Sequence, residues 1–91
     1  MRRKYRCYHD IVESILKAIS EGENRITRIC LRSNIPMDRC KKFLNILEFY
    51  GLITKYSVGA TTYYVILDRG YEWLGTYEYL KILLPLKAYK G

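Results

Sequence analysis

The sequence contains few of the residues and patterns that enzymes and metalloproteins use. It has one histidine, His9, and its three cysteines include no CxxC pair, so it offers no zinc-binding pattern. It has no glycine-rich loop for a phosphate, and His9 has no serine or cysteine partner at a useful spacing. We therefore expect no catalytic residue, metal or cofactor, and no small-molecule ligand is evident.

Long apolar runs are also missing. No stretch approaches the roughly 20 apolar residues that a membrane helix needs. The basic start, Met1 to Arg6, leads into a helix interrupted by Asp10, Glu13 and Lys17 rather than into the apolar core of a signal peptide. These features predict a soluble cytoplasmic protein without a membrane partner.

Acidic residues are outnumbered by basic ones. The chain has 16 lysines and arginines against 9 aspartates and glutamates, a formal net charge of +7. An excess of this kind favours polyanionic partners through long-range attraction and counterion release. The length of 91 residues is enough for one domain with one core. We expect residues 1–91 to form a single domain, so any binding surface belongs to that fold.

Two of the three cysteines fall within predicted helices. Cys30 and Cys40 lie on apolar helix faces, where small apolar side chains pack. Thiols of cytoplasmic proteins are kept reduced. We therefore expect Cys30 and Cys40 to be buried, unpaired thiols.

Hydrophobic periodicity predicts three helices in the first half of the chain. Apolar residues recur at helical spacing from Tyr8 to Glu21, and Gly22 follows as a stop. A shorter pattern spans residues 26–33 and breaks at residues 34–36, where a tight turn is expected. A third helix then runs to Gly51. Its predicted inward-facing residues are Cys40, Phe43, Leu44, Leu47 and Tyr50.

The second half of the chain predicts a hairpin followed by a last helix. Two β-rich runs, Leu52 to Tyr56 and Thr62 to Leu67, are separated by residues 57–61. A helical pattern then covers residues 68–84, and residues 85–91 are expected to form a frayed tail. Large apolar side chains form a stripe on this helix at spacings of four, three and four: Trp73, Tyr77, Leu80 and Leu84.

This order of elements is that of a winged helix-turn-helix, an α+β fold with three N-terminal helices, a β-hairpin wing and a C-terminal helix. In DNA-binding proteins of this kind the third helix enters the major groove. The ten tyrosines could instead suggest stacking on single-stranded nucleic acid. However, Tyr8, Tyr50 and Tyr64 occupy core-facing positions, and no RNA-binding sheet motif surrounds Tyr63. We expect the tyrosines to serve in packing.

Short motifs spread over nearly the whole chain point to a family. They are Arg2-Arg3, Ile11 to Ile15, Thr27-Arg28-Ile29, Asn34-Ile35, Lys41-Lys42-Phe43-Leu44, Gly51-Leu52-Ile53, Tyr64 and Arg69-Gly70-Tyr71-Glu72-Trp73-Leu74. In their order and spacing the sequence resembles an archaeal winged-helix DNA-binding family that includes small dimeric crenarchaeal chromatin proteins and related regulators. The resemblance implies DNA binding and dimerisation through the last helix.

The sequence departs from that family at two helix starts. Pro36 stands where a polar cap is usual and is expected to be the first residue of the third helix. Leu67 replaces a serine or threonine cap of the last helix, so Asp68 is expected to cap it through its side-chain oxygen.

A twofold partner is expected to bury the stripe from Trp73 to Leu84, giving a homodimer.

Basic side chains gather on the two helices expected to meet DNA. The second helix has a stripe at spacings of three and four: Arg25, Arg28 and Arg32. The third helix has donors near its water-facing side: Arg39, Lys41, Lys42 and Asn45. Lysine or arginine can read guanine, asparagine can read adenine, and we expect phosphate contacts from Lys41 or Lys42. The alternative is that both sets are ordinary solvated helix surfaces.

The remaining candidates lie at the wing and at the N-terminus. The wing tip, residues 57–61, has no charge, so we expect a weak contact from it, with Lys55 and Arg69 at its base. Residues 1–7 form a basic arm that could follow DNA, although basic termini are common.

Together these features predict a double-stranded DNA-binding protein that acts without catalysis, as a transcription regulator or a nucleoid-associated protein. The third helix would occupy the major groove. A winged-helix module that binds another protein, with the positive charge serving only solubility, is the alternative.

Overall fold

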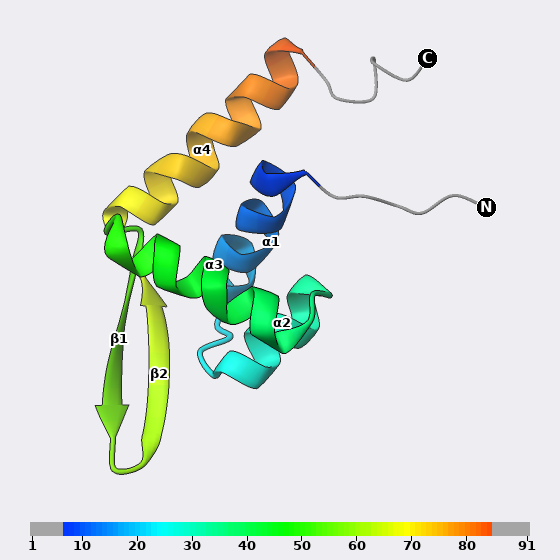
Figure 1. Ribbon diagram of the computed structural model, residues 1–91. Coiled ribbons are helices and arrows are strands. Elements are labelled where there is room, and N and C mark those ends of the chain that lie inside the picture. Colours follow the sequence, from blue (N-terminus) through cyan, green and yellow to red (C-terminus); the bar gives the residue numbers. More distant parts are fainter. Residues whose placement is uncertain (1–6, 85–91) are drawn as a thin grey trace, which may run out of the picture.

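The computed structural model describes residues 7–84. Most of the expected basic arm and the expected tail, residues 85–91, lie outside that range. The elements are α1 (Tyr8–Ser20), α2 (Ile26–Ser33), α3 (Met37–Phe49), β1 (Ile53–Val58), β2 (Thr61–Ile66) and α4 (Asp68–Leu83). This order confirms the α+β winged helix predicted from the sequence (Figure 1).

Helix α1 lies at the centre of the fold and contacts α2, β2 and α4. Its inner face is built from aliphatic residues at helical spacing, and Ile15 and Leu16 are completely buried. Burial of a side chain of this size contributes roughly 1.5–3 kcal/mol. The helix ends at Ser20, and Gly22, two residues later, turns the chain with a φ of 111°, a conformation that glycine adopts readily.

Helices α2 and α3 are joined by the tight turn expected at residues 34–36. Asn34 adopts the left-handed conformation, with φ at 57°, and ends α2. Pro36 is extended, with ψ at 149°, and its carbonyl oxygen accepts a hydrogen bond from the Cys40 amide at 2.9 Å. Pro36 is therefore the cap residue and Met37 begins α3, so the prediction that Pro36 is the first helical residue was wrong by one position.

Cys30 of α2 and Cys40 of α3 form a disulfide, which corrects the prediction of two reduced thiols. Both cysteines are buried, as their positions on apolar faces predicted. The helix crossing brings their Cα atoms to 5.7 Å, within the range that a disulfide spans. Helical periodicity places each cysteine on an inner face but contains no information on which residues of two helices meet.

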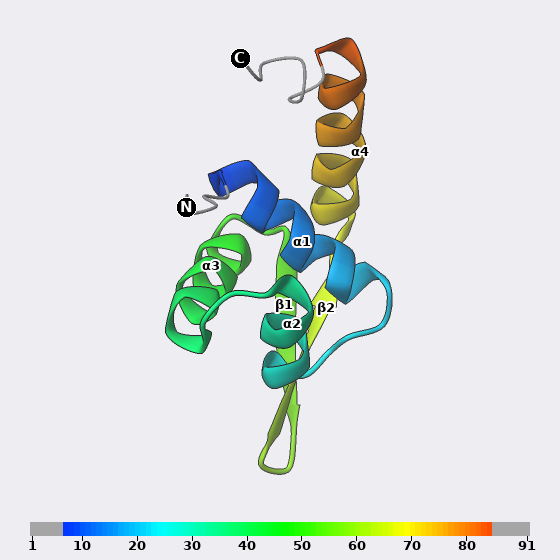
Figure 2. The same ribbon diagram turned by 90° about the vertical axis from the view of Figure 1, so that its right-hand side faces the viewer.

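The wing is an antiparallel hairpin whose register runs from the Ile53–Ile66 pair to the Val58–Thr61 pair. It turns through Gly59, where φ is 63°. Only its base joins the core, through Ile53 and Tyr64, and the remainder extends away from the helices (Figures 1 and 2). The tip of the wing therefore lies free of the body.

Helix α4 starts in tight contact with the segment before the wing. The Leu67 amide donates to the Leu52 carbonyl oxygen at 2.9 Å. A Cβ atom on Gly70 would lie 2.5 Å from that same oxygen, so only glycine fits there without displacement. Leu67 is the cap residue and makes no side-chain cap bond, while Asp68 is already helical. The expected capping role of Asp68 is therefore wrong.

Helix α4 packs against α1 through two polar contacts and through the stacking of Trp73 and Tyr77 on His9. The Tyr77 hydroxyl donates to Asp10 Oδ1 at 3.0 Å, and Lys81 Nζ pairs with Glu13 Oε2 at 2.8 Å. Trp73 packs against the core from the same side of α4. Beyond these contacts the C-terminal part of α4 continues past the start of α1, as both views show (Figures 1 and 2).

Two tyrosines expected in the core are exposed. Tyr8 is 51% exposed and lies at the first position of α1, where its ring reaches Phe43 at a centroid distance of 5.3 Å. Tyr50 is 61% exposed because it follows the last residue of α3 and is no longer on that helix's inner face. Tyr64 is buried as predicted.

Candidate nucleic-acid interface

The outer face of α3 carries all four of the residues predicted there. Arg39, Lys41, Lys42 and Asn45 are exposed. Helical spacing aligns Lys42 and Asn45 with Asp38, opposite the buried residues of α3. The face therefore combines cationic and amide donors, which suit phosphates and the edges of purine bases.

Asp38 is the one acidic group in the first turn of this helix. Its Oδ1 atom accepts a hydrogen bond from the Arg39 amide at 3.0 Å. A carboxylate in the first turn also stabilises the helix dipole. Asp38 thus has a local structural role at the start of α3.

Phe49 lies on the same outer face and was missed as a functional candidate. It is 81% exposed and stands seven residues after Lys42, two helical turns further along. Its ring meets Tyr50 edge to face, with centroids 5.0 Å apart. The helical position of Phe49, in line with Lys42 and Asn45, is the sequence signal that would have identified it. A phenyl ring in this position offers apolar contact to a thymine methyl group.

The three arginines of the predicted stripe have different surroundings. Arg25 lies over the ring of Tyr63, with its guanidinium carbon 5.8 Å from the ring centroid. Arg28 and Arg32 both contact Glu23, a loop residue that the sequence reading did not consider. The structure brings the stripe together on one side of α2 but does not leave it uniformly available to a polyanion.

Ion pairing shifts the titration of this cluster. Hydrogen bonds from Arg32 and Arg28 lower the pKa of Glu23, and the hydrogen bonds to Glu23 and Glu21 raise the pKa of Arg32. The Glu23 carboxylate is therefore charged at neutral pH and forms ion pairs with both guanidinium groups.

The wing contributes few charges to the interface. Lys55 Nζ lies 3.4 Å from Glu48 Oε1 of α3, which offsets part of its charge. Arg69 donates from Nε to the Tyr50 carbonyl oxygen at 3.1 Å and so belongs to the junction with α4. On the other face of the hairpin the rings of Tyr56 and Tyr63 stack at 5.4 Å.

The predicted dimerisation stripe is divided between two environments. Tyr77 is buried, and Trp73 stacks on it and on His9 of α1, at 5.0 Å and 6.1 Å. Leu80 and Leu84, near the C-terminal end of α4, are exposed. Half of the stripe thus packs within the chain, and the other half remains available for a partner.

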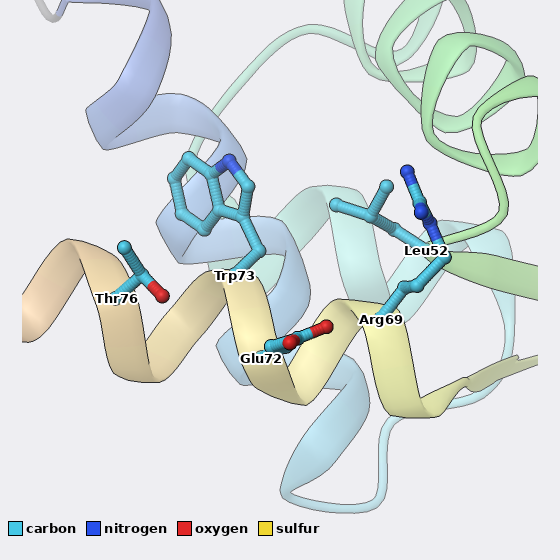
Figure 3. Close-up of a pocket in the computed structure, with 5 residues that line it drawn as sticks. All are labelled: Leu52, Arg69, Glu72, Trp73 and Thr76. Carbon is cyan, nitrogen blue, oxygen red and sulfur yellow. The ribbon is translucent and has the colours of Figure 1, made fainter.

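A hollow of about 280 Å³ lies beside the start of α4, between Leu52, Arg69, Glu72, Trp73 and Thr76 (Figure 3). In Figure 3 the side chains of Leu52 and Arg69 gather at one end of it and the Trp73 ring stands at the other. A second hollow of about 130 Å³ continues along α4. Its lining residues are His9, Trp73, Thr76, Tyr77 and Leu80.

Residues 7–84 contain neither a membrane-spanning helix nor a cluster of metal ligands. No helix in this part of the chain is both long enough and apolar enough to cross a membrane. The same residues contain no group of three or more histidine, cysteine, aspartate or glutamate side chains placed to hold a metal ion.

Comparisons with solved structures find the same fold in several proteins. Sso10a-2, a DNA-binding protein from Sulfolobus solfataricus, is similar with a TM-score of 0.79 and 23% identity, over 93% of this chain and 90% of that one. BpsR from Bordetella bronchiseptica gives 0.76 and 9% identity, over 93% and 62%. AF1382 from Archaeoglobus fulgidus gives 0.69 and 14% identity, over 87% and 91%.

Sequence comparison gives one family. No curated protein sequence matches the chain. The family model described as winged helix-turn-helix matches residues 5–84, which include every helix and strand of the structure. The chain therefore belongs to the winged helix-turn-helix family.

Proposed function

We propose that this protein binds double-stranded DNA, with α3 in the major groove, and acts as a transcription regulator or a nucleoid-associated protein. The observation that carries the proposal is the outer face of α3, where Lys41, Lys42 and Asn45 are exposed on the helix that winged-helix proteins insert into DNA. The net charge of +7 supports it. Its mechanism is occupancy of DNA, with no chemical step.

Two similar proteins are consistent with this proposal. Sso10a-2 is described as a DNA-binding protein, and BpsR as one whose DNA binding is regulated by 6-hydroxynicotinic acid. We propose phosphate contacts from Arg28, Lys41 and Lys42, and base contacts from Arg39 and Asn45. Lys55 adds a weaker contact at the base of the wing because Glu48 offsets its charge.

We also propose that the protein is a homodimer joined by the C-terminal part of α4. Large apolar side chains are exposed around this helix, including Leu80, Ile82, Leu83 and Leu84. Exposed apolar side chains that gather in one place on a surface mark an interaction site. Each such side chain that a partner covers would contribute roughly 1.5–3 kcal/mol, before the cost of association. Sedimentation at micromolar concentration should show a dimer for the wild type and a monomer for Leu80→Lys.

The DNA proposal is tested by fluorescence anisotropy with a labelled duplex at several salt concentrations. Replacing Lys42 with alanine should weaken binding and reduce the salt slope by about one unit for the lost phosphate contact. Lys17→Ala is the matched control because it removes the same charge from α1, outside the proposed interface. Equal effects of the two substitutions would mean that charge alone, without a defined face, explains any binding.

One observation favours a protein-binding module as a second candidate. Phe49 is 81% exposed on the outer face of α3, and Ile46 lies beside it, so this face is partly apolar. Partner proteins bind such patches through buried aromatic anchors. If the wild type binds no duplex at low salt, this second function takes the place of DNA binding.

A further inference from the structure

Glu23 occupies a fixed position between α1 and α2. Its backbone amide donates to the Ala18 carbonyl oxygen at 3.0 Å, which anchors it to the end of α1. Its side chain is only 18% exposed, against 60% for Arg28 and 40% for Arg32. A carboxylate held in this way can determine where neighbouring guanidinium groups point.

Arg32 uses both of its terminal nitrogens within the protein. Nη1 donates to Glu23 Oε2 at 3.1 Å, and Nη2 donates to Glu21 Oε1. Both terminal nitrogens therefore already donate to carboxylates, and a bidentate phosphate contact through them would have to compete with these two bonds. Two carboxylates also surround the single positive charge, which reduces its attraction for a polyanion.

Arg28 is held differently. Its Nε lies 3.4 Å from Glu23 Oε1, so the contact is on the side of the guanidinium group. Within residues 7–84 the polar contact found for Arg28 involves Nε and not Nη1 or Nη2, and the side chain is 60% exposed. An arginine held on one side and open at its end is oriented for a bidentate phosphate contact.

We propose that Glu23 is a positioning residue of the DNA interface, which directs Arg28 toward a phosphate and, together with Glu21, removes Arg32 from DNA contact. The proposal rests on the proposed DNA binding. It divides a stripe whose arginines appear equivalent in the sequence into one ligand-binding residue, Arg28, and one structural residue, Arg32.

The first test compares the two arginines by the salt dependence of duplex binding. Arg28→Gln should lower the salt slope by about one unit, while Arg32→Gln should leave it unchanged. Equal slope changes in the two variants would overturn the proposal. A wild type that binds no duplex would instead refute the proposed function itself, so the two failures can be told apart.

The second test uses Glu21→Gln as the matched control for Glu23→Gln. Both substitutions remove one negative charge near α2, but among residues 7–84 the Glu21 side chain pairs with Arg32 and not with Arg28. We expect Glu23→Gln to bind duplex about fivefold more weakly than Glu21→Gln, as for residues that share a hydrogen-bond network. The difference should disappear when Arg28 is also replaced. Equal affinities of the two variants, or a difference that persists without Arg28, would contradict the positioning role.

A measurement on the wild type avoids any loss of folding in the variants. The side-chain Nε–Hε NMR signals of Arg28 and Arg32 are followed while duplex is added. The Arg28 signal should shift with saturation, and the Arg32 signal should stay in place. A shift of both signals, or of Arg32 alone, would overturn the assignment.

Discussion

Reduction of the Cys30–Cys40 disulfide should destabilise the protein without emptying its core. The bridge closes a loop with a sequence separation of 10. In the chain-entropy model a loop of this length restricts the unfolded chain by about 2.7 kcal/mol at 25 °C. The sulfur atoms remain in the core after reduction, so their packing changes little. The loss is a large part of the roughly 5–15 kcal/mol by which small domains are stable.

Urea unfolding of the oxidised and reduced forms measures this effect. We expect the reduced form, or the double variant Cys30→Ala with Cys40→Ala, to unfold at a lower urea concentration. Reduction of the folded protein should be slow because both cysteines are buried and exposed only after local opening. Cys7 is exposed and unpaired, so Cys7→Ser is the matched control and should leave the midpoint unchanged.

Thiol counting gives the result that would refute this reasoning. The native protein, purified without reductant, should contain one reactive thiol, that of Cys7. Three reactive thiols in that sample would show that the bridge does not form. An identical unfolding midpoint with and without reductant would show that the bridge forms but does not stabilise the fold by restricting the unfolded chain.

Three other substitutions test the contacts of α4. Gly70→Ala should lower the free energy of unfolding by about 1–3 kcal/mol, because its Cβ would lie 2.5 Å from the Leu52 carbonyl oxygen. Gly75→Ala, with open space around it, should raise that energy by up to about 1 kcal/mol. Burial and the bond to Asp10 raise the pKa of Tyr77. Wild-type stability should therefore fall as pH rises above the ordinary tyrosine pKa of about 10, and Tyr77→Phe should lack this fall in alkaline unfolding scans.

Most of the fold could be predicted because its elements follow the periodicity of buried residues. The predicted end of the first helix, Glu21, lies one residue beyond the observed end at Ser20. The third helix ends at Phe49, just before the glycine expected to stop it. Asn34 and Gly22 have backbone conformations that favour their residue types, so the turn and the helix end could be read locally.

The contacts between elements could not be predicted in the same way. Arg28 and Arg32 share a helix face with regular spacing, but Glu23, which pairs with both, comes from the preceding loop. Likewise the stripe on the last helix is continuous in the sequence, while the packing of α4 on α1 buries Tyr77 and leaves Leu84 exposed. Such facts depend on how elements are placed in space, and one-dimensional spacing does not contain that information.

The joint between α4 and the rest of the protein leaves the helix little freedom to tilt. Gly70 lies against the Leu52 carbonyl oxygen, and the Arg69 side chain donates a hydrogen bond to the Tyr50 carbonyl oxygen. The first turn of α4 is therefore fixed to the segment between α3 and β1. A helix of 16 residues is roughly 24 Å long, so a tilt of about 10° at the joint would move its far end by about 4 Å. In any assembly made through α4, the separation of the two α3 helices is therefore set largely at this joint. Small changes in residues 50–52 and 69–70 would alter that separation without touching the surface that joins the two copies.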